Sequence, residues 1–156
     1  MAAYRLFRAT LVGGSIVGVL DLTYAIVVYS PHHPILIPQH IASGLLGPRS
    51  FDGGYMTAAL GVALHFLIAY SAAAVYCLAS RKLPLLIDHA VVCGMIYGAL
   101  VFAFMHIVVV PLSRVHHHPM PFVYSAAEFV WHWFCVGLPI AFSCRHYLQQ
   151  PPESRI

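Results

Sequence analysis

Residues 89–112 read HAVVCGMIYGALVFAFMHIVVVPL, and this stretch decides the class of the protein. It contains no Asp, Glu, Lys or Arg, and it exceeds the roughly 20 apolar residues that a helix needs to cross the hydrocarbon core of a bilayer. Three further stretches, at residues 6–29, 55–80 and 122–147, are also mainly apolar and long enough to cross the bilayer. We therefore predict an all-α polytopic membrane protein, a bundle of four transmembrane helices in contact with the lipid bilayer.

The overall composition agrees with a membrane location. Of the 156 residues, 60% are hydrophobic and 8% are charged, a balance that soluble proteins rarely show. The four stretches use almost the whole chain, so we predict a single transmembrane domain at residues 1–148 and a polar cytoplasmic tail at 149–156. Stretch 6–29 is too long for the apolar region of a signal peptide and is predicted to be an uncleaved first span. Pro139 should kink the fourth helix rather than end it.

The basic residues near the helix ends predict the orientation. Six lie on one side of the predicted membrane, namely Arg5, Arg8, Arg81, Lys82, Arg145 and Arg155, whereas Arg49 and Arg114 lie on the other. By the positive-inside rule, both termini and the loop at 81–88 should be cytoplasmic. This asymmetry accounts for the net charge of +3 without a nucleic-acid partner.

The same orientation places the two longer loops, 30–54 and 113–121, on the outer side. They carry six of the eleven histidines: His32, His33, His40, His116, His117 and His118. For these histidines a solvated turn is favoured over a loop that collects metal ions. Residues 39–46 have apolar side chains four apart but are too few to span, which predicts a short interfacial or re-entrant helix closed by Gly47-Pro48.

Five ionisable side chains interrupt the apolar stretches. They are Asp21, His65, His106, Glu128 and His132. Ionisable groups are costly inside a membrane, so each one is a candidate for the functional site. The helical rise places all five roughly 9 to 15 Å below the outer boundary, which predicts one polar layer in the outer half of the bundle.

The fourth stretch suggests what this layer does. Glu128 and His132 are one helical turn apart, where a carboxylate and an imidazole can bind one cation together or pass a proton between them. With Asp21, His65 and His106 they form a set of nitrogen and oxygen ligands that suits a divalent transition metal, zinc or iron. We therefore predict an integral membrane protein that binds a transition metal or relays protons at this site.

Other functions stay open at this stage. The five side chains could simply hydrogen-bond across the bundle. The protein could be a non-catalytic accessory protein that packs against a larger membrane complex, or a homo-oligomer, through the small-residue rows Gly14–Gly18 and Gly94–Gly98. A b-type haem between His65 and His132 is disfavoured, because the nearby carboxylates do not suit a haem pocket. Residues typical of nucleotide-binding loops or hydrolase elbows are missing from the sequence, so no reaction is predicted.

The second half of the chain resembles a known group of proteins. The motifs that carry the resemblance are His65-Phe-Leu-Ile-Ala, Tyr76-Cys77, Met105-His106 followed by Pro111-Leu112, and Ala127-Glu128-Phe-Val-Trp-His132-Trp. This order, between residues 65 and 147, resembles the YagU-like group of small bacterial inner-membrane proteins. The resemblance implies a helical bundle in a bacterial inner membrane. It implies no reaction, because this group has no assigned molecular activity.

Overall fold

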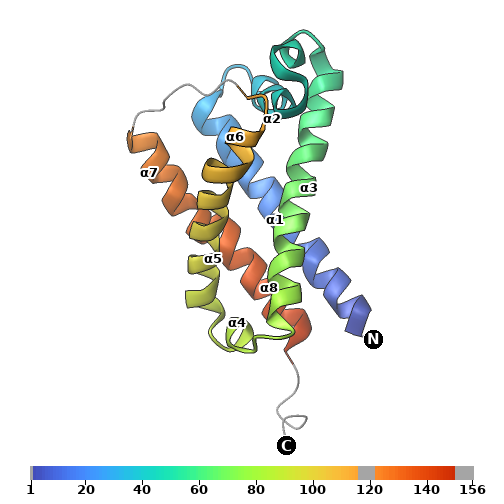
Figure 1. Cartoon of the computed structure of the whole chain (residues 1–156), viewed down its shortest axis with the longest axis vertical. Helices are drawn as coiled ribbons and strands as arrows, with labels where there is room; N and C mark the ends of the chain where they lie inside the picture. Colours follow the sequence, from blue (N-terminus) through green and yellow to red (C-terminus); the bar gives the residue numbers. More distant parts are fainter. Residues whose placement is uncertain (1, 116–121, 150–156) are drawn as a thin grey trace, which may run out of the picture.

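The computed structural model describes residues 2–115 and 122–149, and within these ranges the chain is helical without strands. Four helical segments are long and apolar enough to cross a membrane. They are Ala2–Tyr29, Gly54–Ser80, Ala90–Leu112 and Phe122–Leu148 (Figure 1). The prediction of an all-α chain with four candidate spans is therefore confirmed, and each predicted span agrees with the observed helix within a few residues.

The start of α1 (Ala2–Tyr29) and the end of the last helix, α8 (Leu138–Leu148), lie at the same end of the molecule (Figure 1). We call this the terminal end and the opposite one the loop end. The first two spans are uninterrupted helices, α1 (Ala2–Tyr29) and α3 (Gly54–Ser80). The short helix α4 (Leu85–Asp88) connects α3 to the third span at the terminal end.

The third and fourth spans each contain a π-helical segment. The third consists of α5 (Ala90–Phe104), the π segment η2 (Met105–Val109) and α6 (Val110–Leu112). The fourth consists of α7 (Phe122–Trp131), the π segment η3 (His132–Gly137) and α8 (Leu138–Leu148). The fourth span thus continues through Pro139 without ending, as the sequence predicts.

A proline follows each π segment and explains it. Pro111 comes two residues after η2, and Pro139 two residues after η3. Proline has no backbone N–H, and its ring clashes with the carbonyl group four residues earlier in an α-helix. A wider turn before the proline removes this clash while the helix continues, and such π turns are frequent at functional sites.

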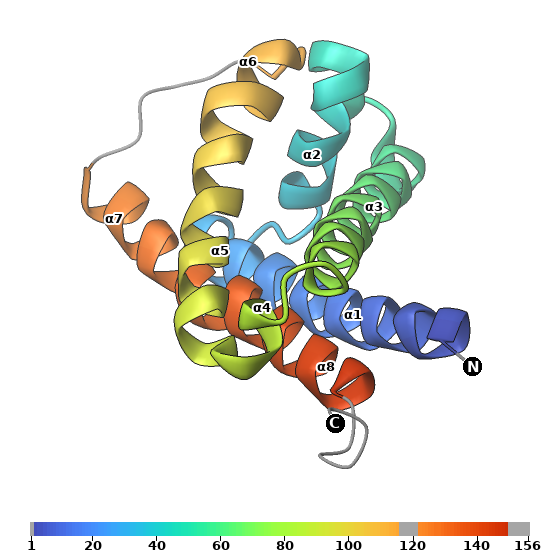
Figure 2. The ribbon, with the colours of Figure 1, turned by 60° about the horizontal axis from the view of Figure 1, so that its bottom comes forward.

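Helices α1 and α8 lie in the middle of the molecule. α1 packs against α3 and α8, and α5 packs against η3 and α8. Figure 2 shows the backbones of α3 and α5 apart from one another, and the two helices meet through side chains: the Tyr97 hydroxyl donates to the Ala72 carbonyl at 2.7 Å, and the rings of Tyr76 and Tyr97 lie 5.0 Å apart. The bundle is therefore closed at the terminal end, where α8 meets the other spans, and more open at the loop end.

Glycines allow the helices to approach closely. A Cβ atom on Gly14 or Gly18 would lie 2.3 and 2.5 Å from ring atoms of Tyr70 and Phe66 in α3. A Cβ atom on Gly98 would lie 2.2 Å from the backbone oxygen of His132. Both rows of small residues, at Gly14–Gly18 and Gly94–Gly98, are therefore used for packing within the chain.

A short helix covers part of the loop end. The sequence predicts a helix at 39–46 closed by Gly47-Pro48. The structure contains α2 (Leu36–Leu46), which passes directly into the 3₁₀ turn η1 (Gly47–Phe51). Gly47 has a φ angle of 64°, a conformation that other residues rarely adopt, and its N–H donates to the Ser43 carbonyl. α2 packs on α3, and the Arg114 N–H donates to the Gly44 carbonyl at 3.0 Å. The location of helix α2 in the membrane interface stays a prediction.

Candidate functional site

A histidine–carboxylate pair in the loop-end half joins the third and fourth spans. Nε2 of His106, in η2, lies 4.0 Å from Oε2 of Glu128, in α7. The two side chains are 31% and 21% exposed, so both are largely buried but neither is sealed. When the imidazole is protonated, the two groups form an ion pair inside a segment that is otherwise apolar.

A third residue completes this group. Tyr29, the last residue of α1, donates its hydroxyl hydrogen to Oε2 of Glu128 at an oxygen–oxygen distance of 3.4 Å. The ring of Tyr29 also lies 6.1 Å, between centroids, from each of the rings of Tyr24 and Tyr124. The sequence did not predict Tyr29 as a site residue, because an aromatic residue at the end of a span usually acts as an interfacial anchor.

The backbone fixes the orientation of two histidine rings. Nδ1 of His106 lies 3.0 Å from the carbonyl oxygen of Phe102, and Nδ1 of His132 lies 2.8 Å from that of Glu128. A carbonyl oxygen only accepts hydrogen bonds, so Nδ1 carries the hydrogen in each ring. In the neutral imidazole Nε2 is then left as an acceptor. The His132 ring therefore contacts the backbone carbonyl group of Glu128 and not its side-chain carboxylate.

Phe102 lies against both of these rings. Its centroid is 4.1 Å from that of His106 and 5.3 Å from that of His132. His132 is buried at 6% exposure, and its backbone oxygen faces Gly98 of α5. The contact between α5 and η3 therefore sets the position of the His132 ring, and one aromatic side chain connects the two histidines.

The remaining predicted site residues lie elsewhere. Nε2 of His65, in α3, lies 3.1 Å from the Gly18 carbonyl oxygen, so His65 joins α3 to α1. Asp21 lies in α1, three residues before Tyr24. Among the described residues neither side chain forms a hydrogen bond or ion pair with His106, Glu128 or His132. Of the five predicted residues, the structure brings together His106, Glu128 and His132.

The ligand set predicted for a metal is not assembled in the part of the chain that the structure describes. Residues 2–115 and 122–149 contain no group of three or more His, Cys, Asp or Glu side chains that could hold a metal ion. His32 and His33 are exposed at the loop end, and the ring of His40 lies 6.4 Å from that of Phe51. His116, His117 and His118 fall outside the described residues, as does the tail after Gln149.

Comparisons with known proteins add no assignment. Neither the protein-family models, nor the curated proteins, nor the solved structures yield a match to this chain. The resemblance to the YagU-like group therefore stays a prediction from the motifs quoted above. What the site does has to be argued from its own geometry.

Proposed function

We propose that this protein is a multi-pass membrane protein that holds and relays a proton at Glu128 and His106 in the loop-end half of the bundle. The observation that carries the proposal is the pair of contacts at the His106 ring. Nδ1 is held by the Phe102 carbonyl, and Nε2 faces the Glu128 carboxyl group at 4.0 Å.

This geometry has a direct chemical consequence. With the ring hydrogen on Nδ1, a neutral His106 directs the Nε2 lone pair toward Glu128. If the carboxyl group were ionised at the same time, two acceptors would face each other in a medium of low polarity. A proton on either Nε2 or Oε2 removes this conflict, so the pair holds one proton. Because 4.0 Å exceeds direct hydrogen-bond reach, the proton passes between the partners through a bridging water molecule.

The neighbouring residues provide a path for that proton. Tyr29 at the end of α1 donates to the same Oε2 atom that faces His106. Its hydroxyl group, the Glu128 carboxyl group and the His106 imidazole form a row of three groups that each can give and accept a proton. Since Tyr29 ends its helix, the row begins at the loop end and leads toward the middle of the bundle.

Titration and proton flux together test this proposal. In the purified protein, the imidazole signals of His106 in a nuclear magnetic resonance titration should change their transition pH when Glu128→Gln removes the partner. In vesicles that enclose a pH-sensitive dye, Glu128→Gln and His106→Gln should each slow the decay of an imposed pH difference. His146→Gln is the matched control, because His146 is exposed at the terminal end. Independent titration of His106 would refute the shared proton, and equal decay rates in all variants would refute the relay.

A transition metal is the second candidate ligand, and one observation favours it. Histidines that bind metals usually donate their other ring N–H to a backbone carbonyl or carboxylate, as both His106 and His132 do here. Nε2 of His106 and the Glu128 carboxyl group, 4.0 Å apart, would be the first two ligands, and the His132 ring would have to turn toward them to complete the site, with zinc or iron as the metal. Mass spectrometry of the purified protein tests this. About one metal ion per chain that is lost in Glu128→Ala/His132→Ala would support a metal site, and equal, near-zero contents would remove it.

The surroundings of the site are proposed from the sequence. The distribution of basic residues and the YagU-like motifs favour a bacterial inner membrane with both termini cytoplasmic. The proton site would then open toward the outer side. An accessory role in a larger complex has lost its main support, because both small-residue rows pack within the chain. The haem alternative also gains nothing from the structure, since Nε2 of His65 is engaged by Gly18.

A further inference from the structure

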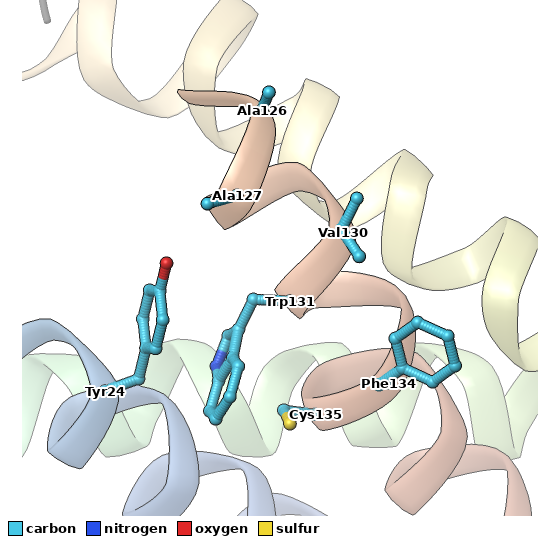
Figure 3. Close-up of a pocket in the computed structure, with 7 residues that line it drawn as sticks. All are labelled: Tyr24, Ala126, Ala127, Val130, Trp131, Phe134 and Cys135. Atoms are coloured by element: carbon cyan, nitrogen blue, oxygen red, sulfur yellow. The ribbon is translucent and has the colours of Figure 1, made fainter. Parts of the chain in front are cut away.

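A separate feature of the loop-end half is an open hollow between α1 and α7. It has a volume of about 620 Å³ and is lined by Tyr24, Ala126, Ala127, Val130, Trp131, Phe134 and Cys135. This volume lies in the range of pockets for small organic ligands. Figure 3 shows the rings of Tyr24 and Trp131 side by side, with Cys135 and Phe134 on the far side of Trp131.

The aromatic part of this hollow has a defined arrangement. The rings of Tyr24 and Trp131 are stacked, with centroids 4.2 Å apart and an angle of 17° between their planes. Each ring covers one face of the other, and the outward faces are electron-rich surfaces that attract cations, most strongly where water is excluded. The indole nitrogen of Trp131 has no hydrogen-bond partner among the described residues.

A carboxylate adjoins the same hollow. Asp21 lies three residues, about one helical turn, before Tyr24 in α1, so the two side chains lie on the same face of that helix, and Tyr24 lines the hollow. Within the described residues Asp21 forms no hydrogen bond or ion pair. It lies eight residues before the end of α1, which corresponds to about 12 Å along the helix, so it sits well inside the span. A carboxylate at such a depth normally pairs with a partner of opposite charge.

We propose that this hollow binds a lipophilic organic cation, such as a quaternary ammonium or phosphonium ion, with its charge at Asp21 and its apolar substituents against Tyr24, Trp131 and Phe134. Charge complementarity favours this occupant over a neutral acyl chain, because an acyl chain would leave the Asp21 carboxylate in hydrocarbon without a partner. The site uses a different carboxylate from the one at the proton pair. It therefore does not depend on the function proposed above.

Two ions of the same shape and opposite charge provide the test. Tetraphenylphosphonium and tetraphenylborate are equilibrated by dialysis with the full chain in uncharged detergent micelles, and protein-free micelles give the background. We expect the phosphonium ion to bind at least about tenfold more tightly than the borate ion, because the carboxylate attracts one and repels the other. Asp21→Asn should abolish this preference. Asp52→Asn, which removes an exposed carboxylate at the loop end, should leave it unchanged.

The two tryptophans of the chain supply a second matched pair. Trp131→Leu should weaken binding of the phosphonium ion several-fold, whereas Trp133→Leu should not, because Trp133 packs on Phe129 and does not line the hollow. If Asp21→Asn does not fold, Asp21→Glu serves in its place and should retain the preference for the cation. Equal binding of both ions to the native protein would overturn the proposal, as would a preference that persists in Asp21→Asn.

Discussion

Gly98→Ala is the substitution that most directly tests the packing behind the proton site. The added Cβ atom would lie 2.2 Å from the backbone oxygen of His132, 2.8 Å from its carbonyl carbon and 3.0 Å from the Cα atom of Trp133. All three are backbone atoms, so no side-chain rotation relieves the overlap. Reaching an ordinary contact of 3.4 Å requires α5 and η3 to separate by about 1.2 Å (3.4 − 2.2).

The expected cost follows from this separation. Overpacking of a tight contact typically costs about 1 to 3 kcal/mol, which exceeds the gain of up to about 1 kcal/mol from replacing glycine by alanine in a helix. The same movement displaces the His132 ring from Phe102, so the transition pH of His106 should change as well. Gly44→Ala is the matched control, because its Cβ atom would meet only ordinary contacts at 3.6 and 3.8 Å.

Thermal unfolding in detergent micelles, followed by circular dichroism, measures the first effect, and the titration of His106 measures the second. Gly44→Ala should unfold at the native temperature or slightly above it, and Gly98→Ala several degrees lower. If Gly98→Ala is as stable as Gly44→Ala and His106 titrates as in the native protein, α5 and η3 are not in close contact. The argument that their contact positions the site would then fail.

Three further predictions follow from the same contacts. Tyr29→Phe removes the hydroxyl donor to Glu128 and should shift the infrared carboxyl band of that residue at a stability cost of about 0.6 kcal/mol; an unchanged band would show that the hydrogen bond is not formed. His65→Leu should lower stability by about 1 kcal/mol through loss of the bond to Gly18, yet leave the His106 titration unchanged, since His65 lies apart from the pair. An alkaline phosphatase fused after Gln149 should be inactive in a bacterial host, because the C-terminus is predicted to be cytoplasmic; an active fusion would reverse the orientation.

The spans could be predicted from sequence because one physical rule dominates them. A stretch such as 89–112 can hide its backbone from lipid only as a helix, so length and apolar character suffice. The structure of the loop end was predicted less accurately. The short helix α2 begins three residues before the predicted start at Gln39, and the chain does not stop at Gly47-Pro48 but turns as a 3₁₀ helix. The Gly47-Pro48 pair marked where the helix ends, but it did not predict that a 3₁₀ turn follows.

The candidate site was predicted in part. Depth along each helix placed His106, Glu128 and His132 at similar levels, and in the structure these residues lie near one another on the third and fourth spans. Depth alone does not give the rotation of a helix about its axis, and the rotation directs His65 toward Gly18. Tyr29 was missed because a tyrosine at the end of a span is usually an interfacial anchor. Its hydroxyl group reaches Glu128 from α1 although the backbones of α1 and α7 make little contact, and sequence spacing does not reveal such a side-chain contact between spans.

The sequence nevertheless contains a signal for the site that could have been used. His106 lies five residues before Pro111, and His132 seven residues before Pro139. Each proline forces a wide turn directly before it, and each wide turn carries one of the two histidines. A π turn rotates the residues that follow it relative to a regular helix, so the two prolines determine which side chains of these spans face each other. Replacing Pro111 by alanine should let η2 return to regular α-helix and move Nε2 of His106 away from Glu128. The His106 titration would then no longer respond to Glu128→Gln, whereas a response of native size would show that Pro111 does not hold the ring in place.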